Sequence, residues 1–169
     1  VLTTFWVILS CILFVGRFVP LKSLLILLKA ILLIKKDYPN IKAYFIGGQK
    51  EDSDYDNVFN FIQQNNLTKN IILIGPLMQS EILSYYNKSK VFVLSSYAEA
   101  TGQVILEAMS CELPVVVSSA GGIVDNLIDY KHGLLFKYPN YIELSEKIKM
   151  ILEDPQLAKK LAKNAKKMV

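Results

Sequence analysis

The sequence is poor in the side chains that build most catalytic metal sites and nucleophile triads. It has one histidine, His132, and two cysteines, Cys11 and Cys111, among 169 residues. His132 lies in a Tyr-Lys-His-Gly stretch that is typical of a turn. With no second histidine, neither a histidine-based metal cluster nor a Ser/His/Asp triad is expected. Both cysteines stand in apolar stretches, which is typical of reduced thiols rather than of a disulfide framework. We therefore expect a cytoplasmic protein without a bound metal.

Two common nucleotide motifs are also missing. The three spaced glycines of a dinucleotide-binding turn do not follow the first apolar run, where Gly16-Arg17-Phe18-Val19-Pro20 stands instead, and no Gly-Lys-Ser/Thr occurs. Nicotinamide enzymes and nucleoside triphosphatases therefore become weak candidates. The stretch Asp52-Ser53-Asp54 matches a metal-chelating Asp-x-Asp pattern, but it lies at an expected helix start, where acidic residues are favoured anyway.

Charge is absent from residues 1–16 and concentrated near the other end. The uncharged run is short for a membrane-spanning helix, which needs ~20 apolar residues, and no basic residue precedes it as in a signal peptide. Residues 11–15 are better explained as a buried strand, and residues 1–10 are left as an unplaced lead-in or linker remnant. The net charge is only +4, and five lysines cluster in the last stretch: Lys159, Lys160, Lys163, Lys166 and Lys167. We interpret them as a solvated helix face, expect no nucleic-acid partner, and leave peripheral contact with the cytoplasmic membrane surface as an open alternative.

Apolar runs and helical periodicities alternate along the chain. Hydrophobic residues make up 52% and charged residues 20%, enough for a core covered on two sides. Such alternation predicts an α/β fold with a doubly wound, mainly parallel six-stranded Rossmann-like sheet and helices on both faces. We expect strands at 11–15, 41–46, 71–74, 91–94, 115–117 and 133–136. Helices are expected at 21–36, from 51–56 to 66, from an N-cap at Ser80 to 86, after Gly102, near 124–128, and at 141–153 and 155–168.

Charged and glycine residues follow several of these strands. Glu99 lies in the loop after the fourth strand, and Glu107 lies in the next helix with seven residues between them. Other such residues are Arg17, Lys22, Gly47-Gly48 and Gly121-Gly122. Parallel strands end at one sheet edge, so two cations and a free helix N-terminus would form a diphosphate site there, with a helical carboxylate for a ribose diol. The alternative is that Arg17 and Lys22 are surface charges and Glu107 is paired structurally.

Several of these stretches together resemble one enzyme family. They are residues 14–22 with Arg17 and Lys22, the Glu99-to-Glu107 element, and residues 111–117 through Gly121-Gly122 and 133–136. In this order and spacing they resemble the group 1, or family 4, glycosyltransferases, from Ile12 onward. The resemblance implies the carboxyl-terminal, donor-binding domain of the two-domain GT-B architecture, here residues 11–169. It also implies a missing amino-terminal acceptor domain.

The resemblance assigns a role to each matching residue. Arg17 and Lys22 would hold the donor diphosphate beside Gly16, Glu107 would take the ribose hydroxyls, and Glu99 would lie against the donor sugar as the catalytic carboxylate. Backbone groups of Ala100, Thr101, Gly102 and Gln103 would contact sugar and phosphate. Members of the family transfer a sugar from a nucleotide-diphosphate sugar to a glycan, lipid or other acceptor, with retention and with no metal or other cofactor.

Some positions depart from the family pattern. Ala100 and Thr101 replace the usual glycine and aromatic residue, which leaves the donor sugar open, and Ser23 and Glu112 replace common glycines. Residues 1–169 alone would bind a donor but transfer no sugar. The alternatives are a non-catalytic nucleotide or nucleotide-sugar binding module and, less favoured, another GT-B enzyme such as a sugar epimerase.

Overall fold

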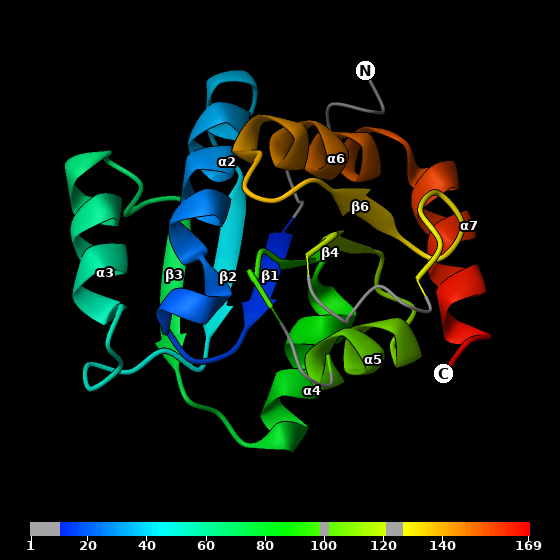
Figure 1. Cartoon of the computed structure of the whole chain (residues 1–169), viewed down its shortest axis with the longest axis horizontal. Helices are drawn as coiled ribbons and strands as arrows, with labels where there is room; N and C mark the ends of the chain where they lie inside the picture. Colours follow the sequence, from blue (N-terminus) through cyan, green and yellow to red (C-terminus); the bar gives the residue numbers. More distant parts are fainter. Residues whose placement is uncertain (1–10, 99–101, 121–126) are drawn as a thin grey trace.

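The structure is a computed structural model that describes residues 11–98, 102–120 and 127–169. Its centre is a six-stranded sheet in the order β3-β2-β1-β4-β5-β6, with all described pairings parallel (Figure 1). The strands are β1 (Cys11–Val15), β2 (Lys42–Ile46), β3 (Ile71–Gly75), β4 (Val91–Leu94), β5 (Val115–Ser118) and β6 (Leu134–Phe136). The strand order reverses between β1 and β4, which in open α/β sheets is where ligands bind. The predicted doubly wound parallel sheet is thus confirmed.

The central strands are apolar on both sides because helices cover both faces. Every residue of β4 and of β5 is buried, as is most of β1. Residue strings such as Val-Phe-Val-Leu cannot leave one face to water, so they favour a strand between two helical layers. This explains why continuous apolar runs, rather than alternation, marked the strands in the sequence.

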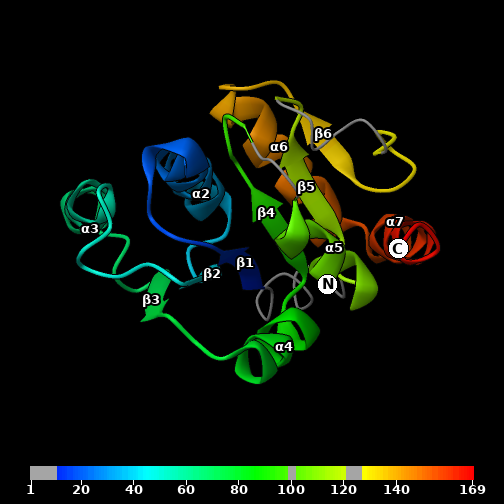
Figure 2. The same cartoon turned by 60° about the horizontal axis from the view of Figure 1, so that its bottom comes forward.

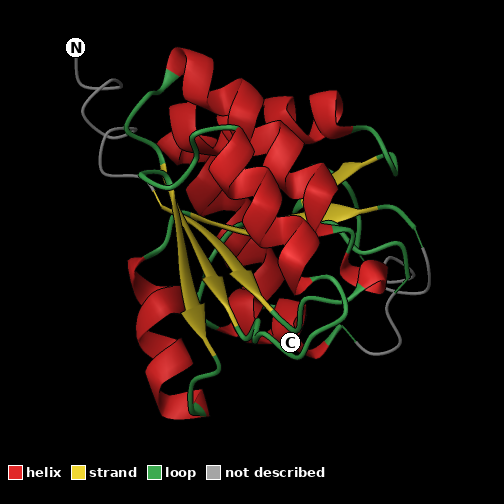
Figure 3. Cartoon of the chain, turned by 90° about the vertical axis from the view of Figure 1, so that its left-hand side faces the viewer, coloured by secondary structure: helices red, strands yellow, loops and turns green. Residues whose placement is uncertain are grey.

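Two helical layers enclose the sheet (Figures 2 and 3). One face carries α2 (Leu24–Asp37), α3 (Tyr55–Gln64) and α6 (Tyr141–Glu153), with α2 packed between the other two. The other face carries α4 (Gln79–Lys88) and α5 (Gln103–Ser110), and α7 (Pro155–Lys166) packs against α5 and α6. Among the described residues, none of the helices has the length and apolarity needed to cross a bilayer.

Three local expectations from the sequence are wrong or incomplete. The helix expected from residue 21 is preceded by a short 3-10 helix, η1 (Pro20–Lys22), and starts only after Ser23, whose φ is 50°. Ser80 is not the N-cap of α4: Met78 is, and its N–H donates to Glu81 Oε2 at 2.9 Å. Most of the helix expected near 124–128 lies outside the described residues, and Leu127 and Ile128 are not helical.

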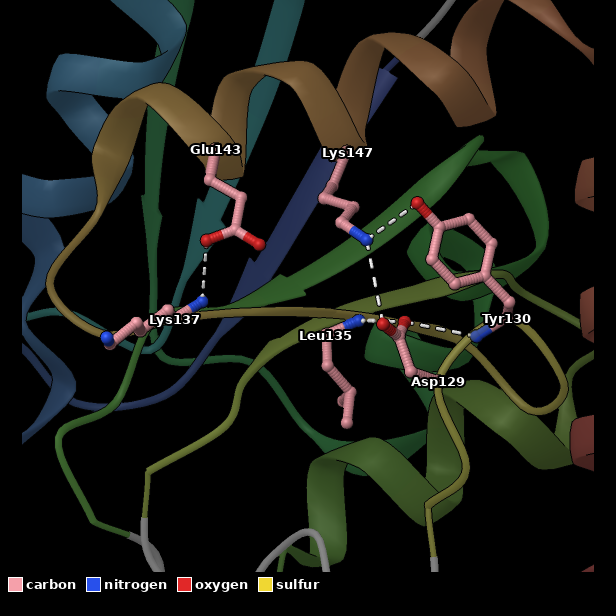
Figure 4. Close-up of polar contacts among 6 residues, drawn as sticks. All are labelled: Asp129, Tyr130, Leu135, Lys137, Glu143 and Lys147. Carbon is pink, nitrogen blue, oxygen red and sulfur yellow. Dashed lines mark hydrogen bonds and ion pairs between the residues drawn. The ribbon is translucent and has the colours of Figure 1, made fainter.

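A polar cluster joins α6 to the turn before β6 (Figure 4). The nearly buried Lys147 Nζ lies 2.9 Å from the Tyr130 hydroxyl and 3.6 Å from Asp129 Oδ2. Asp129 Oδ1 accepts the N–H groups of Tyr130 and Leu135, at 3.0 and 2.8 Å. Because every polar group in this cluster has a partner within it, we interpret it as structural: it anchors the turn to the helix.

Cys11 and Cys111 are free and half-buried thiols.

Candidate functional site at the carboxyl edge of the sheet

Glycines allow the loops after β1 and β2 to pack against each other. The Gly16 N–H donates to the Ile46 carbonyl at 2.9 Å, and Gly47 has a φ of +102°. A Cβ at Gly47 would lie 2.8 Å from the Gly16 carbonyl oxygen, and one at Gly48 would lie 2.4 Å from the Phe18 ring. Only glycine fits such a close approach. The loop that carries Arg17 therefore packs closely against the loop that leads toward α3.

Arg17 makes an ion pair with a carboxylate from that neighbouring loop. Its Nε donates to Asp52 Oδ1 at 2.9 Å, and its Nη2 lies 2.8 Å from the same oxygen. The Asp52 side chain is 0% exposed, whereas the Arg17 side chain is 67% exposed. Arg17 therefore extends from a buried anchor into solvent at the sheet edge.

The second oxygen of Asp52 is occupied by the backbone. Oδ2 accepts the Phe18 N–H at 2.9 Å and the Gln49 N–H at 3.2 Å. Burial alone would raise the pKa of this carboxyl, but the hydrogen bonds from Phe18, Arg17 and Gln49 and the charge of Arg17 outweigh it and lower the pKa. Asp52 is consequently a carboxylate at neutral pH.

Lys22 is held at the same edge by the end of β4. Its carbonyl accepts the Ser95 hydroxyl at 2.9 Å, and the carbonyl of the preceding Leu21 accepts the Tyr97 N–H at 2.9 Å. The Lys22 Cε would lie 3.5 Å from a Cβ on Gly16, so the side chain lies over Gly16, next to Arg17 in the chain. The predicted cations thus share one region, and it adjoins the loop that leads to α5.

The first turn of α5 follows that loop. Gly102 is its N-cap, with a φ of 56°, and Gln103 is its exposed first residue. The leading N–H groups of a helix have no partner inside the helix, which suits an anionic group. Glu99, Ala100 and Thr101, and likewise Gly121-Gly122, lie outside the described residues. Their predicted roles stay predictions.

The Glu107 side chain contacts α4. The hydroxyl of the buried Tyr86 donates to Glu107 Oε2 at 2.9 Å. Burial and, next, the bond to the Glu107 carboxylate raise the pKa of Tyr86 far above its ordinary value, so the tyrosine stays a donor. A hollow of about 350 Å³ lies between the two helices and is lined by Gln79, Ser80, Leu83, Tyr86, Gln103, Leu106, Glu107, Ser110 and Cys111. Glu107 therefore has a structural partner and also borders space for a ligand.

Comparison with known proteins now decides the family. Residues 10–168 match the family described as glycosyl transferases, group 1. The chain belongs to this family. Its curated relatives include an uncharacterized glycosyltransferase, MJ1178, of Methanocaldococcus jannaschii, which is 36% identical over 91% of this chain and 41% of its own length. The chain thus spans about two fifths of the length of such relatives.

Solved structures of other proteins share the fold. The carboxyl-terminal domain of the group 1 protein LpcC from Francisella tularensis superimposes with a TM-score of 0.85 at 28% identity, covering 95% of this chain and 84% of that one. Anabaena Alr3699/HepE, crystallised with UDP-glucose, gives a TM-score of 0.85 at 25% identity, covering 94% of this chain and 43% of that one.

Three residues of the site were not identified from sequence. Asp52 lies at a predicted helix start, Tyr86 is the last residue of a predicted helix, and Ser95 directly follows the strand predicted at 91–94. Their partners Arg17, Glu107 and Lys22 are 35, 21 and 73 residues away in the chain, so no local spacing could indicate the contacts. In the described part of the chain, no group of three or more His, Cys, Asp or Glu side chains is placed to hold a metal.

Proposed function

We propose that this chain is the donor-binding half of a retaining, metal-independent glycosyltransferase that takes a sugar from a nucleotide-diphosphate sugar. Arg17 and Lys22 bind the diphosphate beside the first turn of α5. Glu107 accepts hydrogen bonds from the ribose hydroxyls, and Glu99 contacts the donor sugar. The acceptor, a glycan, lipid or other molecule, belongs to an amino-terminal domain of the longer polypeptide.

The carrying observation is the exposed Arg17 guanidinium, held by a buried carboxylate at the point where the strand order reverses. Asp52 uses only the Nε and one Nη2 N–H group of Arg17, and most of the side chain faces water, so the remaining N–H groups can donate to an anion. HepE, with the same fold, was crystallised with UDP-glucose, which supports a uridine nucleotide as the first probe.

Binding of uridine diphosphate (UDP) tests the diphosphate site. We expect Arg17→Ala and Lys22→Ala each to weaken UDP binding by about 1.5–3 kcal/mol, the usual contribution of a charge-assisted hydrogen bond, and to leave uridine binding unchanged. Isothermal titration calorimetry measures both ligands. Lys36→Ala is the matched control, because Lys36 is an exposed cation in the last turn of α2, away from the η1 end. UDP affinities equal to the parent's in both site variants would contradict the diphosphate assignment.

The two glutamates can be separated by comparing ligands. Glu107→Gln should weaken UDP and UDP-glucose alike, since both carry ribose, whereas Glu99→Gln should weaken only the sugar-bearing ligand. An equal loss for both ligands in the Glu99 variant would place that residue away from the sugar. The second candidate is a non-catalytic nucleotide or nucleotide-sugar binding module; a module that binds only the nucleotide would bind UDP and UDP-glucose with no preference that depends on Glu99.

A further inference from the structure

Both oxygens of the Asp52 carboxylate accept hydrogen bonds from the protein. One oxygen takes the Arg17 guanidinium, and the other takes the N–H groups of Phe18 and Gln49. Its side chain is wholly buried. A buried carboxylate with a full set of donors has one orientation, because any rotation would leave a donor unpaired.

The backbone around Phe18 is fixed from the same segment. The Phe18 carbonyl accepts the Asp54 N–H at 3.0 Å, while its N–H donates to Asp52. The Phe18 ring is buried against Gly48. Both backbone groups of Phe18, the residue after Arg17, are therefore hydrogen-bonded, which fixes the backbone from which Arg17 projects. Asp52 sets the direction of the Arg17 guanidinium.

This arrangement changes what Arg17 can offer to an anion. An exposed arginine samples many rotamers, and ordering it on a ligand costs free energy that a pre-oriented side chain does not lose. Asp52 uses Nε and one edge of Nη2, and the remaining guanidinium N–H groups stay available at the exposed end.

We propose that Asp52 is a positioning residue for diphosphate recognition: it orients the Arg17 guanidinium toward the phosphate groups of the donor. The proposal rests on the proposed function of Arg17 and adds a residue that would not touch the ligand. The negative charge of Asp52 would by itself repel a diphosphate. Its four hydrogen-bond and ion-pair contacts offset that charge locally, so orientation outweighs repulsion.

A double-mutant cycle on the chain of residues 1–169 tests the proposal. Asp52→Asn should weaken UDP binding by about tenfold in the parent, a typical coupling for residues in direct contact. Uridine binding should change less than about twofold, the usual additivity error. In the Arg17→Ala background, Asp52→Asn should cause almost no further loss of UDP affinity. A residue with a merely structural role would weaken UDP equally in both backgrounds.

Asp54→Asn is the matched control. It removes a buried carboxylate from the same segment, one whose Oδ1 accepts Asn57 Nδ2 at 2.8 Å and makes no described contact with Arg17. It should leave the affinity for UDP unchanged. Circular dichroism establishes the folded state of each variant. If Asp52→Asn does not fold, Asp52→Glu replaces it, because it keeps both oxygens and the charge but displaces the guanidinium by one methylene group.

The outcomes separate the two proposals. If the parent binds neither UDP nor any other nucleoside diphosphate, the proposed function is wrong. If Arg17→Ala weakens UDP binding but folded Asp52→Asn, or its glutamate substitute, binds UDP as tightly as the parent or more tightly, only the positioning role is wrong. An equal loss in the parent and Arg17→Ala backgrounds would also overturn it. A loss confined to the parent background and to UDP supports it.

Discussion

At the scale of single residues, Glu107 shares its carboxylate between a buried tyrosine and the hollow between α4 and α5. The Tyr86 hydroxyl is the donor, and its ring packs against Phe92 in the core. Tyr86→Phe keeps the ring and removes only the donor, leaving the half-buried Glu107 with one hydrogen bond fewer. We expect the free energy of unfolding to fall by about 1–2 kcal/mol, measured by urea denaturation. UDP binding should weaken as well, because Glu107 loses its fixed orientation.

Tyr85→Phe serves as the control for this prediction. Tyr85 lies on the same helix, but its ring packs against Tyr44 and is only half-buried. Loss of the Tyr85 hydroxyl should change neither the free energy of unfolding nor the affinity for UDP appreciably. Similar effects of the two substitutions would mean that the contact between Tyr86 and Glu107 contributes nothing specific.

Residues such as Tyr86 and Asp52 show why the site was only partly predictable from the sequence. Arg17 and Lys22 stand close together after an apolar run, so their position at the sheet edge followed once the strand was recognised. The carboxylates and hydroxyls that orient them come from other loops, and an aspartate before a helix is common enough to carry no signal of its own. Contacts of this kind depend on the folded arrangement of loops rather than on spacing.

At the scale of elements, the contact between the loops after β1 and β2 depends on Gly47, and Gly75 at the end of β3 serves as a comparison. Gly47 has both a positive φ and no room for a Cβ, whereas Gly75 has a positive φ of +79° with its nearest neighbour 3.9 Å from a Cβ. We expect Gly75→Ala to cost about 1 kcal/mol of unfolding free energy, from backbone strain alone. Gly47→Ala should cost more, by about 1–3 kcal/mol, because the clash with the Gly16 carbonyl adds to the strain.

Thermal and urea denaturation of both variants would measure this difference. Gly47→Ala should also weaken UDP binding, since it pushes away the loop that carries Arg17, while Gly75→Ala should not. Equal destabilisation by the two substitutions would show that the loops can separate without cost, and the close approach would then not fix Arg17.

The elements that were predicted correctly are those whose signal is local. Buried strands are continuous apolar runs, and α6 and α7 begin directly after Asn140 and Asp154, whose side chains cap them as such residues commonly do. The start of α2 was missed because Ser23 adopts a left-handed conformation. The Ser23 N–H donates to the Pro20 carbonyl at 2.9 Å, and the Ser95 hydroxyl approaches the Ser23 carbonyl at 3.3 Å from 72 residues away. The second contact could not be indicated by residues 20–24.

At the scale of the whole molecule, the carboxyl edge carries apolar side chains as well as the cations. Leu21, Met78 and Tyr97 are exposed, and they lie on the segments that follow β1, β3 and β4. Exposed apolar groups beside a polar binding site are typical of a surface that another protein layer covers. The curated relative MJ1178 is longer, since this chain spans 41% of it, so a longer protein has residues to spare for the amino-terminal acceptor domain that the proposed function assigns as the cover.

Sugar transfer should therefore require more than the residues described here. Transferases bring donor and acceptor together in a water-poor cleft, and the rate depends on groups from both sides being positioned at once. We expect residues 1–169 to bind a nucleotide-diphosphate sugar, to hydrolyse it marginally at most, and to transfer no sugar to any acceptor, while the same residues joined to the proposed amino-terminal acceptor domain are active. Transfer of a radiolabelled sugar, measured with both polypeptides at equal donor saturation, distinguishes these cases. Acceptor-dependent turnover by a monodisperse preparation of residues 1–169 would instead make this domain a self-sufficient enzyme.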